Sequence, residues 1–268
     1  MRRLLWAATL SMVVALGPVA GKAQEARSGG HVPDTVMGPR GLALGIESRF
    51  HNQVDDLVSP LRYSGVGFGP GLRWGFSGPS GIRDVTASYG SPRLTSSATA
   101  RGSHFQEGHR FDTRLMVLQR VGSLGSGRVS FFLGGSIAGH FALYQHWYTR
   151  EDKESWVHAF GLLQPGFGWS AELPRGGQLW QDVTFPLLGV AVRPGYEGLT
   201  EPPTAVWVGA GDVKGVDQAI HFLQPMGKRF RLGLTYAFAG LSYAEPQELA
   251  WNRQSLSLWV TVWNGGVG

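Results

Sequence analysis

The sequence predicts an all-β fold, an antiparallel up-and-down transmembrane β-barrel of about ten strands. Three observations predict it. Segments of roughly ten residues alternate large apolar residues with glycine or polar residues, with the period of two of a β-strand. The spacers between these segments alternate between short and long, which is typical of barrels that cross a membrane. An export signal precedes them all. Twelve strands, with a further pair in 91–109 or 193–215, is the alternative count.

The first 23 residues have the pattern of a secretory signal peptide. Arg2 and Arg3 precede an apolar run over 4–16, and Gly21 and Ala23 provide the small residues that a signal peptidase reads. An uncleaved membrane anchor is the rival interpretation, but the run is shorter than the roughly 20 residues that a spanning helix needs. We therefore expect a cleaved signal at 1–23, a periplasmic lead-in at 24–40 and a barrel domain at 41–268.

Composition narrows the classes of protein to be considered. The chain has no cysteine, so disulfides and thiolate metal sites are excluded. Its net charge is +5, but Arg2, Arg3 and Lys22 lie in the signal, which has no acidic residue; 21 basic and 19 acidic residues remain, a net +2. Nucleic-acid binding therefore lacks its electrostatic basis. The 40 glycines lie within the apolar alternations rather than in a linker.

The segment 63–76 shows the alternation most clearly. Val66, Phe68 and Trp74 fall on one face, whereas the other face is almost entirely glycine. A soluble sandwich would place polar side chains opposite its core, whereas a small barrel has a crowded interior and an apolar exterior. Pro70 lacks the N–H that a central strand donates, so it predicts a bulge.

Ten segments carry this pattern in order: 41–50, 63–76, 82–90, 110–121, 128–144, 156–171, 178–192, 216–224, 229–240 and 254–263. Short spacers lie near 79 and at 122–127, 174–177 and 225–228. Long spacers lie at 51–62, 91–109, 145–155, 193–215 and 241–253. The stretch 205–209 could form an additional strand, and we interpret it as a β-excursion within the fourth long loop. An eleventh barrel strand there would invert every later loop.

Aromatic residues are expected in two belts at the membrane interfaces. The belt beside the short turns is predicted from Trp74, Phe76, Trp169, Trp180 and Trp263. The belt beside the long loops is predicted from Tyr63, Tyr144, Trp147, Trp156, Tyr243 and Trp251. Aromatics that cap a soluble core are the alternative.

Polar residues within the strands are expected to face the lumen, because a charge facing lipid costs about 2 to 4 kcal/mol at the midplane. The residues assigned to the lumen are Glu47, Arg49, Arg73, Asp112, Arg114, Gln164 and Arg231. Two interpretations remain open for them. The first is an ion-pair network that fills the barrel, and the second is a narrow, arginine-lined path for small anions.

His140 and His158 are weak candidates for catalysis. They share the lumen face of neighbouring strands, either two pairs apart or diagonal to each other, depending on the centre of the intervening loop. Two histidines could bind a metal or act as acid and base. However, Ser136 on the same strand is roughly 13 Å from His140, too far for a nucleophile and its base. We expect no metal site and no cofactor, and the simpler interpretation is that the histidines are lumenal polar residues satisfied by neighbours and water.

These features, together with a last strand reading SLSLWVTVW, resemble the bacterial outer-membrane β-barrel superfamily, broadly its small monomeric members. The resemblance implies the outer membrane as location, contacts with outer-membrane lipid and lipopolysaccharide, the barrel-assembly machinery as a partner during biogenesis, and a monomer. Arg150 and Lys153 in the loop 149–155 are candidates for lipopolysaccharide contacts. In the family the chain commonly ends on an aromatic residue, whereas here Trp263 is followed by NGGVG.

Three hypotheses for function follow. The first is a barrel with a structural, surface-interaction or narrow-pore role and no catalysis. The second is an embedded hydrolase that acts on lipid or surface peptide at the extracellular rim. The third is a soluble periplasmic barrel that binds an apolar ligand. The sequence carries no motif that identifies a substrate.

Overall fold

The computed structural model describes residues 41–56, 59–78, 81–96, 104–125, 128–147, 153–193, 204–227, 229–244 and 248–263. The predicted signal and lead-in, 1–40, lie outside this part. The strands are β1 (Gly41–Asp55), β2 (Ser59–Gly78), β3 (Gly81–Gly90), β4 (Arg93–Ser96), β5 (Phe105–Leu124), β6 (Val129–Trp147), β7 (Lys153–Glu172), β8 (Gln178–Thr184), β9 (Leu188–Arg193), β10 (Thr204–Gly209), β11 (Val213–Met226), β12 (Phe230–Tyr243) and β13 (Leu249–Trp263).

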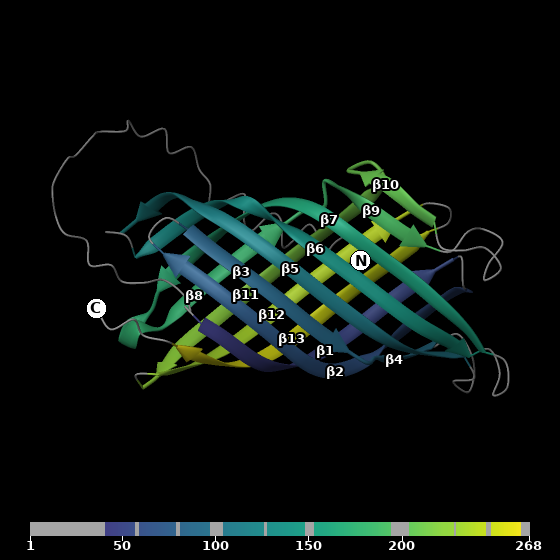
Figure 1. Cartoon of the computed structure of the whole chain (residues 1–268), viewed down its shortest axis with the longest axis horizontal. Helices are drawn as coiled ribbons and strands as arrows, with labels where there is room; N and C mark the ends of the chain where they lie inside the picture. The colour runs from purple at the N-terminus through teal and green to yellow at the C-terminus, as the bar shows by residue number, and fades with distance from the viewer. Residues whose placement is uncertain are drawn as a thin grey trace. The chain divides into compact units, whose positions relative to one another are not determined.

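The strands close into one antiparallel barrel with ten strand positions (Figure 1). Each position pairs with its neighbours in sequence, and β1 pairs with β13 from Gly41↔Trp263 to Asp55↔Leu249, which closes the sheet. The predicted all-β fold and the count of ten are confirmed. β3 and β4 share the third position and β8 and β9 share the seventh. Closure leaves the barrel wall without the open sheet edges that a membrane excludes.

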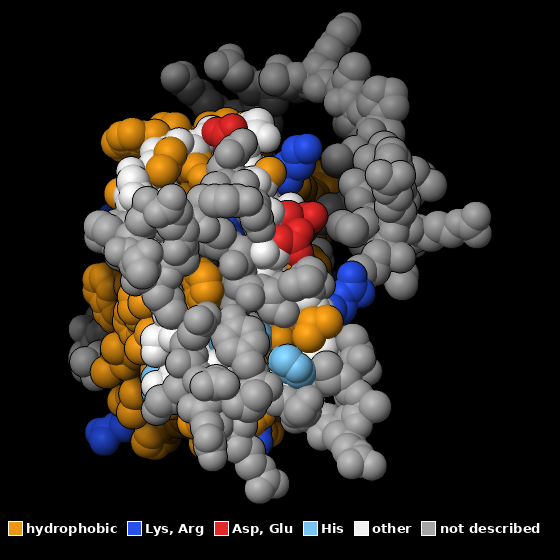
Figure 2. Space-filling view, turned by 90° about the vertical axis from the view of Figure 1, so that its right-hand side faces the viewer, with side chains coloured by type: hydrophobic (Ala, Val, Ile, Leu, Met, Phe, Trp, Pro, Cys, Tyr) orange, Lys and Arg blue, Asp and Glu red, His pale blue; other side chains and the backbone are white. Residues whose placement is uncertain are grey.

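The polarity of the barrel is inverted relative to a soluble protein. On β1 the outward Ile46 is 71% exposed, whereas the inward Arg49 is 0% exposed. Figure 2 looks onto one end of the barrel and shows hydrophobic side chains, in orange, along the outer wall. On β5 exposed apolar side chains extend from Phe111 to Val121, ten residues apart, and Leu124 follows at the end of the strand. At roughly 3.3 Å per residue and a tilt of about 40°, this band is about 25 Å high, the thickness of a membrane-spanning apolar band.

No helix among the described residues is long and apolar enough to cross a membrane. The helical element in this part of the chain is one 3₁₀ turn, Pro174–Gly176, in the short connection between β7 and β8. This connection lies at the same end of the barrel as those that join β2 to β3, β5 to β6 and β11 to β12, which we call the short-turn end. The opposite end is the long-loop end.

The strands continue further toward the long-loop end than the sequence predicted. The expected spacer 51–62 is wrong, because β1 runs to Asp55 and β2 begins at Ser59. The expected spacer 91–109 is likewise interrupted by β4, which pairs with both β2 and β5. Beyond the apolar band both faces of a strand can be polar. The period-two apolar signal therefore ends there, although backbone pairing continues.

The bulge predicted at Pro70 is also wrong. Ile46 pairs with Pro70 in a register that is continuous from Gly41 to Val54. On its other edge, β2 pairs with β4 over 63–66 and with β3 over 71–78. Pro70 lies between these two paired stretches, where no strand pairing is formed on that edge. The missing N–H is tolerated there without an extra residue.

The interpretation of 205–209 as an excursion is confirmed. Thr184 pairs with Asp217 on β11, and Leu188 pairs with Gly209 on β10. The chain advances four positions from Thr184 to Leu188 but eight from Gly209 to Asp217, so the segment between β10 and β11 contains four extra residues. Among the described strands, β10 pairs with β9 alone. In Figure 1 β9 and β10 form a hairpin near the long-loop end, in which β9 continues the wall beside β7.

The inward glycines make room for large side chains. A Cβ on Gly45 would lie 2.4 Å from the Trp259 ring, and a Cβ on Gly71 would lie 2.6 Å from it. Trp259 on β13 therefore packs across the inner faces of β1 and β2. This explains why glycine alternates with large apolar residues in these strands.

The predicted aromatic belts are largely wrong. Six of the residues assigned to them are buried in the interior: Tyr63, Tyr144, Trp156, Trp180, Tyr243 and Trp251. Trp74 is outward and 59% exposed as expected, and Trp207, which the prediction omitted, is 75% exposed. The side chains of Phe76 and Trp263 lie outside the described part. Closeness to a loop in sequence does not decide which face of a strand a residue occupies, because parity decides it.

Candidate functional site in the barrel lumen

The lumen contains the seven polar residues assigned to it from the sequence, Glu47, Arg49, Arg73, Asp112, Arg114, Gln164 and Arg231. Six of them are buried, and the Arg114 side chain is 19% exposed. The sequence analysis missed seven further charged residues that join them there: Asp55, Asp84, Arg110, Asp182, Arg193, Asp217 and Arg253. Strand parity alone could have found Asp84, Arg110, Asp182 and Asp217, which lie within predicted segments. Asp55, Arg193 and Arg253 lie in stretches that we predicted as loop.

Asp112 on β5 is the central acceptor of the middle of the lumen. Its Oδ1 accepts hydrogen bonds from Arg110 Nε at 3.2 Å and from His140 Nδ1 at 2.8 Å. Its Oδ2 accepts from Arg49 Nη1 at 3.2 Å and from Arg253 Nη1. Glu47 takes the remaining face of Arg49, with Oε2 at 3.1 Å from Nη2. One buried carboxylate thus accepts hydrogen bonds from side chains on β1, β5, β6 and β13.

A second network lies closer to the short-turn end. Arg73 donates from Nε and Nη2 to the two oxygens of Asp84, at 2.8 and 3.0 Å, a bidentate pair. Its Nη1 lies 3.0 Å from His221 Nδ1, and His221 Nε2 lies 3.0 Å from Asp182 Oδ2. Since Arg73 is a donor, His221 accepts at Nδ1 and donates its Nε2–H to Asp182. Arg114 binds the other oxygen of Asp182 at 2.6 Å.

Several of these contacts cross the barrel rather than join neighbouring strands. Arg253 on the tenth position binds Asp112 on the fourth, and Arg73 on the second binds His221 on the eighth. Nearer the long-loop end, Arg193 on β9 binds Asp55 on β1 at 2.6 Å. Each contact joins strand positions that are four apart around the barrel, and in a barrel of ten positions directly opposite strands are five apart. The lumen is therefore bridged across most of its width at three levels.

A cavity of about 110 Å³ lies between the Asp112 network and the Arg73 network nearer the short-turn end. Acidic and basic groups both line it, including Glu47, Asp217, Arg114 and Arg253. Asp217 accepts from Gln164 Nε2 at 2.7 Å. The volume holds several water molecules, and its mixed lining favours neither cations nor anions.

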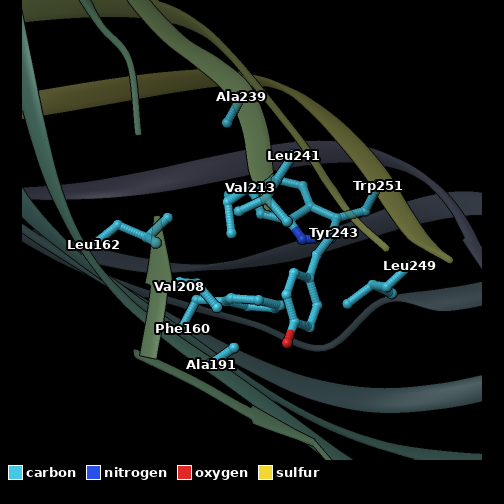
Figure 3. Close-up of a cluster of buried hydrophobic side chains, with 10 residues drawn as sticks. All are labelled: Phe160, Leu162, Ala191, Val208, Val213, Ala239, Leu241, Tyr243, Leu249 and Trp251. Atoms are coloured by element: carbon cyan, nitrogen blue, oxygen red, sulfur yellow. The ribbon is translucent and has the colours of Figure 1, made fainter. Parts of the chain in front are cut away.

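Toward the long-loop end the lumen becomes apolar. Ten buried residues from β7 and from β9 to β13 form one cluster there (Figure 3): Phe160, Leu162, Ala191, Val208, Val213, Ala239, Leu241, Tyr243, Leu249 and Trp251. The Phe160 and Tyr243 rings meet edge to face with centroids 5.7 Å apart. The cluster is a packed core, so it adds a dry layer to the charged bridges beneath it.

The two candidate histidines are diagonal neighbours, because His140 pairs with Phe160 and His158 pairs with Ala142. His140 is bound to Asp112, and its ring lies 5.2 Å from that of Trp251. His158 packs against the Tyr144 ring, with centroids 5.7 Å apart. Ser136 donates to Gln164 rather than to a histidine. Within the described part of the chain, no group of three or more histidine or acidic side chains could hold a metal ion.

The inverted polarity, the closed ten-position sheet and the filled interior together decide the architecture. The fold is that of a transmembrane β-barrel. No protein-family model matches this chain, and no curated protein matches it.

Solved structures similar to this one are outer-membrane barrels. The outer-membrane protease OmpT from Escherichia coli has a TM-score of 0.44 at 7% identity, covering 85% of this chain and 98% of that one. The translocator domain of the autotransporter NalP from Neisseria meningitidis has a TM-score of 0.43 at 10% identity, covering 84% and 89%. Neisserial surface protein A has a TM-score of 0.31 at 10% identity, covering 84% and 98%. At these low scores we draw no conclusion on function from the likeness.

Proposed function

We propose that this protein is a closed, non-conducting outer-membrane barrel with a structural or surface-presenting role. The observation that carries the proposal is the set of cross-barrel contacts. Asp55–Arg193, Asp112–Arg253 and Arg73–His221 bridge the lumen at three levels. The arginines along the axis are paired with carboxylates in these networks, which favours a filled lumen over an open path for anions.

The other hypotheses have less support. A narrow pore would need an ion to pass both the apolar cluster and the Asp112 network, whose side chains are at most 13% exposed. A rim hydrolase would need a free nucleophile beside a histidine, whereas Ser136 is bound to Gln164 and His140 to Asp112. A soluble ligand-binding barrel would not place residues such as Ile46 on its outer surface.

Single-channel recording in planar bilayers tests the closed state. The wild-type barrel is expected to give no conductance steps. The double variant Asp112→Ala with Arg253→Ala removes one cross-barrel contact as a charge-balanced pair, and small steps are expected from it. Regular conductance steps from the wild-type protein would contradict the proposal.

We further propose export through a cleaved signal and assembly in the outer membrane as a monomer. Mass determination of the mature protein should give Gln24 as the first residue. The detergent-extracted outer-membrane fraction should contain a band whose gel mobility changes on boiling. A soluble periplasmic protein with unchanged mobility would overturn the membrane location.

The outer wall of β4, β5 and β6 suits the headgroup of lipopolysaccharide. The Arg93 guanidinium lies 4.6 Å from the centre of the Phe105 ring, and that ring stacks on Trp147 at 5.5 Å. Arg93 remains exposed, with its Nε 3.5 Å from Glu107. An exposed cation on an aromatic platform above the apolar band can bind a phosphate and pack against a sugar. Arg150 and the side chain of Lys153, the residues proposed from the sequence, lie outside the described part.

The matched control for this contact is Arg83, which is also exposed on the outer wall but lies near the short-turn end. We expect Arg93→Ala to weaken retention of lipopolysaccharide during purification, and Arg83→Ala to leave it unchanged, since lipopolysaccharide occupies the outer leaflet. Equal losses in the two variants would contradict this assignment.

A further inference from the structure

The inference concerns the layer of the lumen just above Asp112 toward the long-loop end, formed by Arg110, His51 and Trp251. The Arg110 guanidinium lies 4.0 Å from the centre of the Trp251 ring. His51 pairs across the sheet with Arg253, two residues from Trp251 on the same inward face of β13. Three strands, β1, β5 and β13, thus bring these side chains to one place. We call them the Arg110 layer.

Each member of the Arg110 layer has a nitrogen without a hydrogen-bond partner among the described residues. These atoms are Arg110 Nη2, His51 Nε2 and Trp251 Nε1. The three residues are buried, with exposures of 1, 2 and 4%. The guanidinium and the indole can only donate, and His51 Nε2 donates in one of its tautomers. The layer therefore offers several buried donors and has no carboxylate of its own to accept from them.

The carboxylates nearby are already in use, and the Tyr144 hydroxyl beside Arg110 is an acceptor without charge. Asp112 receives four donors, two on each oxygen, and Glu47 is bound to Arg49. His51 also interacts electrostatically with three positive guanidinium groups, those of Arg110, Arg253 and Arg49, and with one negative carboxylate, that of Asp112. Buried donors left unpaired are costly, and a local excess of positive charge adds to that cost. A bound anion would accept hydrogen bonds from the unpaired donors and would also balance the positive charge.

We propose that the Arg110 layer binds one small inorganic anion of the size of chloride. Because all three side chains are at most 4% exposed, a monatomic ion suits the layer better than a phosphate or a carboxylate. The ion accepts from Arg110 Nη2 and Trp251 Nε1, with His51 as a third donor. It thereby stabilises the folded barrel without being transported, and a chain of water molecules alone would satisfy the donors without balancing the charge.

Two experiments test the site on the full mature protein in detergent. Crystals soaked in bromide should show an anomalous peak within hydrogen-bond distance of Arg110 Nη2. Unfolding in urea should depend on chloride when gluconate replaces it at constant ionic strength. At chloride ten times above its dissociation constant, the ratio of folded to unfolded protein rises about tenfold.

Variants separate the site from general salt effects. Trp251→Phe keeps the ring and removes one donor, so it should reduce the chloride dependence and lower the bromide occupancy; Arg110→Gln should abolish both. Trp259→Phe removes the same kind of donor lower in the lumen and should leave the chloride dependence unchanged. Absence of a bromide peak together with equal stability in chloride and gluconate would mean that water alone fills the layer, and would overturn the proposal. A conducting wild-type barrel would overturn the proposed function and leave this site intact.

Discussion

Replacing Asp112 by Asn is the sharpest test of the lumen network. The change is nearly isosteric, so it removes the negative charge and leaves the volume unchanged. Four donors converge on the carboxylate, three of them from arginines. Asn can accept with one oxygen, and its NH₂ group then faces guanidinium donors. Breaking a buried ion pair by removing one partner costs about 3 to 5 kcal/mol, and we expect a loss of that size in the free energy of unfolding.

The assay is equilibrium unfolding in urea of the barrel refolded into lipid vesicles, followed by tryptophan fluorescence and gel mobility. The control is Asp217→Asn, which weakens one direct hydrogen bond, from Gln164, and longer-range attraction to Arg114 and Arg253, and should cost about 1 to 3 kcal/mol. Adding Arg253→Met to Asp112→Asn removes one uncompensated cation and should recover at least about 1 kcal/mol. A loss below about 1 kcal/mol for Asp112→Asn, or no larger than that of Asp217→Asn, would refute the central role of this carboxylate.

Three further outcomes are expected from the same assay. Gly71→Val places a side chain against the Trp259 ring and should destabilise the barrel by about 1 to 3 kcal/mol, with partial recovery on adding Trp259→Leu; an unchanged midpoint would contradict the packing. Ile46→Arg on the lipid face should lower the free energy of unfolding by about 2 to 4 kcal/mol, whereas Asn52→Arg beyond the apolar band should lower it by about 0 to 1 kcal/mol. Equal losses in the two variants would argue against a membrane-spanning apolar band. Phe160→Ala in the apolar cluster should cost about 3 to 5 kcal/mol, and a smaller loss would show that the cluster collapses around the gap.

Much of the fold could be predicted because the alternation of side chains reports directly on the two environments of a barrel wall. Val66, Phe68 and Trp74 against intervening glycines predicted a strand with one face in lipid and one in a crowded interior, and both faces are as expected. The short turns predicted the order of the hairpins. Parity also predicted that Arg49, Arg73 and Asp112 share one side of the wall.

The partners of those charges could not be predicted. Asp112 meets Arg253 141 residues later in the chain, and Arg73 meets His221 148 residues later. Such pairs depend on which strands oppose each other across the closed sheet, and parity carries no information on this. The aromatic belts failed for a related reason, because Tyr243 and Trp251 lie beside a loop in sequence but point inward.

The sequence by itself predicted the closed antiparallel sheet, ten as the favoured number of strands, and the lumen face for polar residues within the predicted segments, because all three follow from local periodicity and spacer length. Only the tertiary structure decided that the lumen is bridged at three levels, that an apolar cluster lies above the Asp112 network, and that Arg110, His51 and Trp251 have unpaired donors. Closure brings together strands that are remote in sequence. The chemistry of the interior therefore depends on cross-barrel distances that only the closed structure sets.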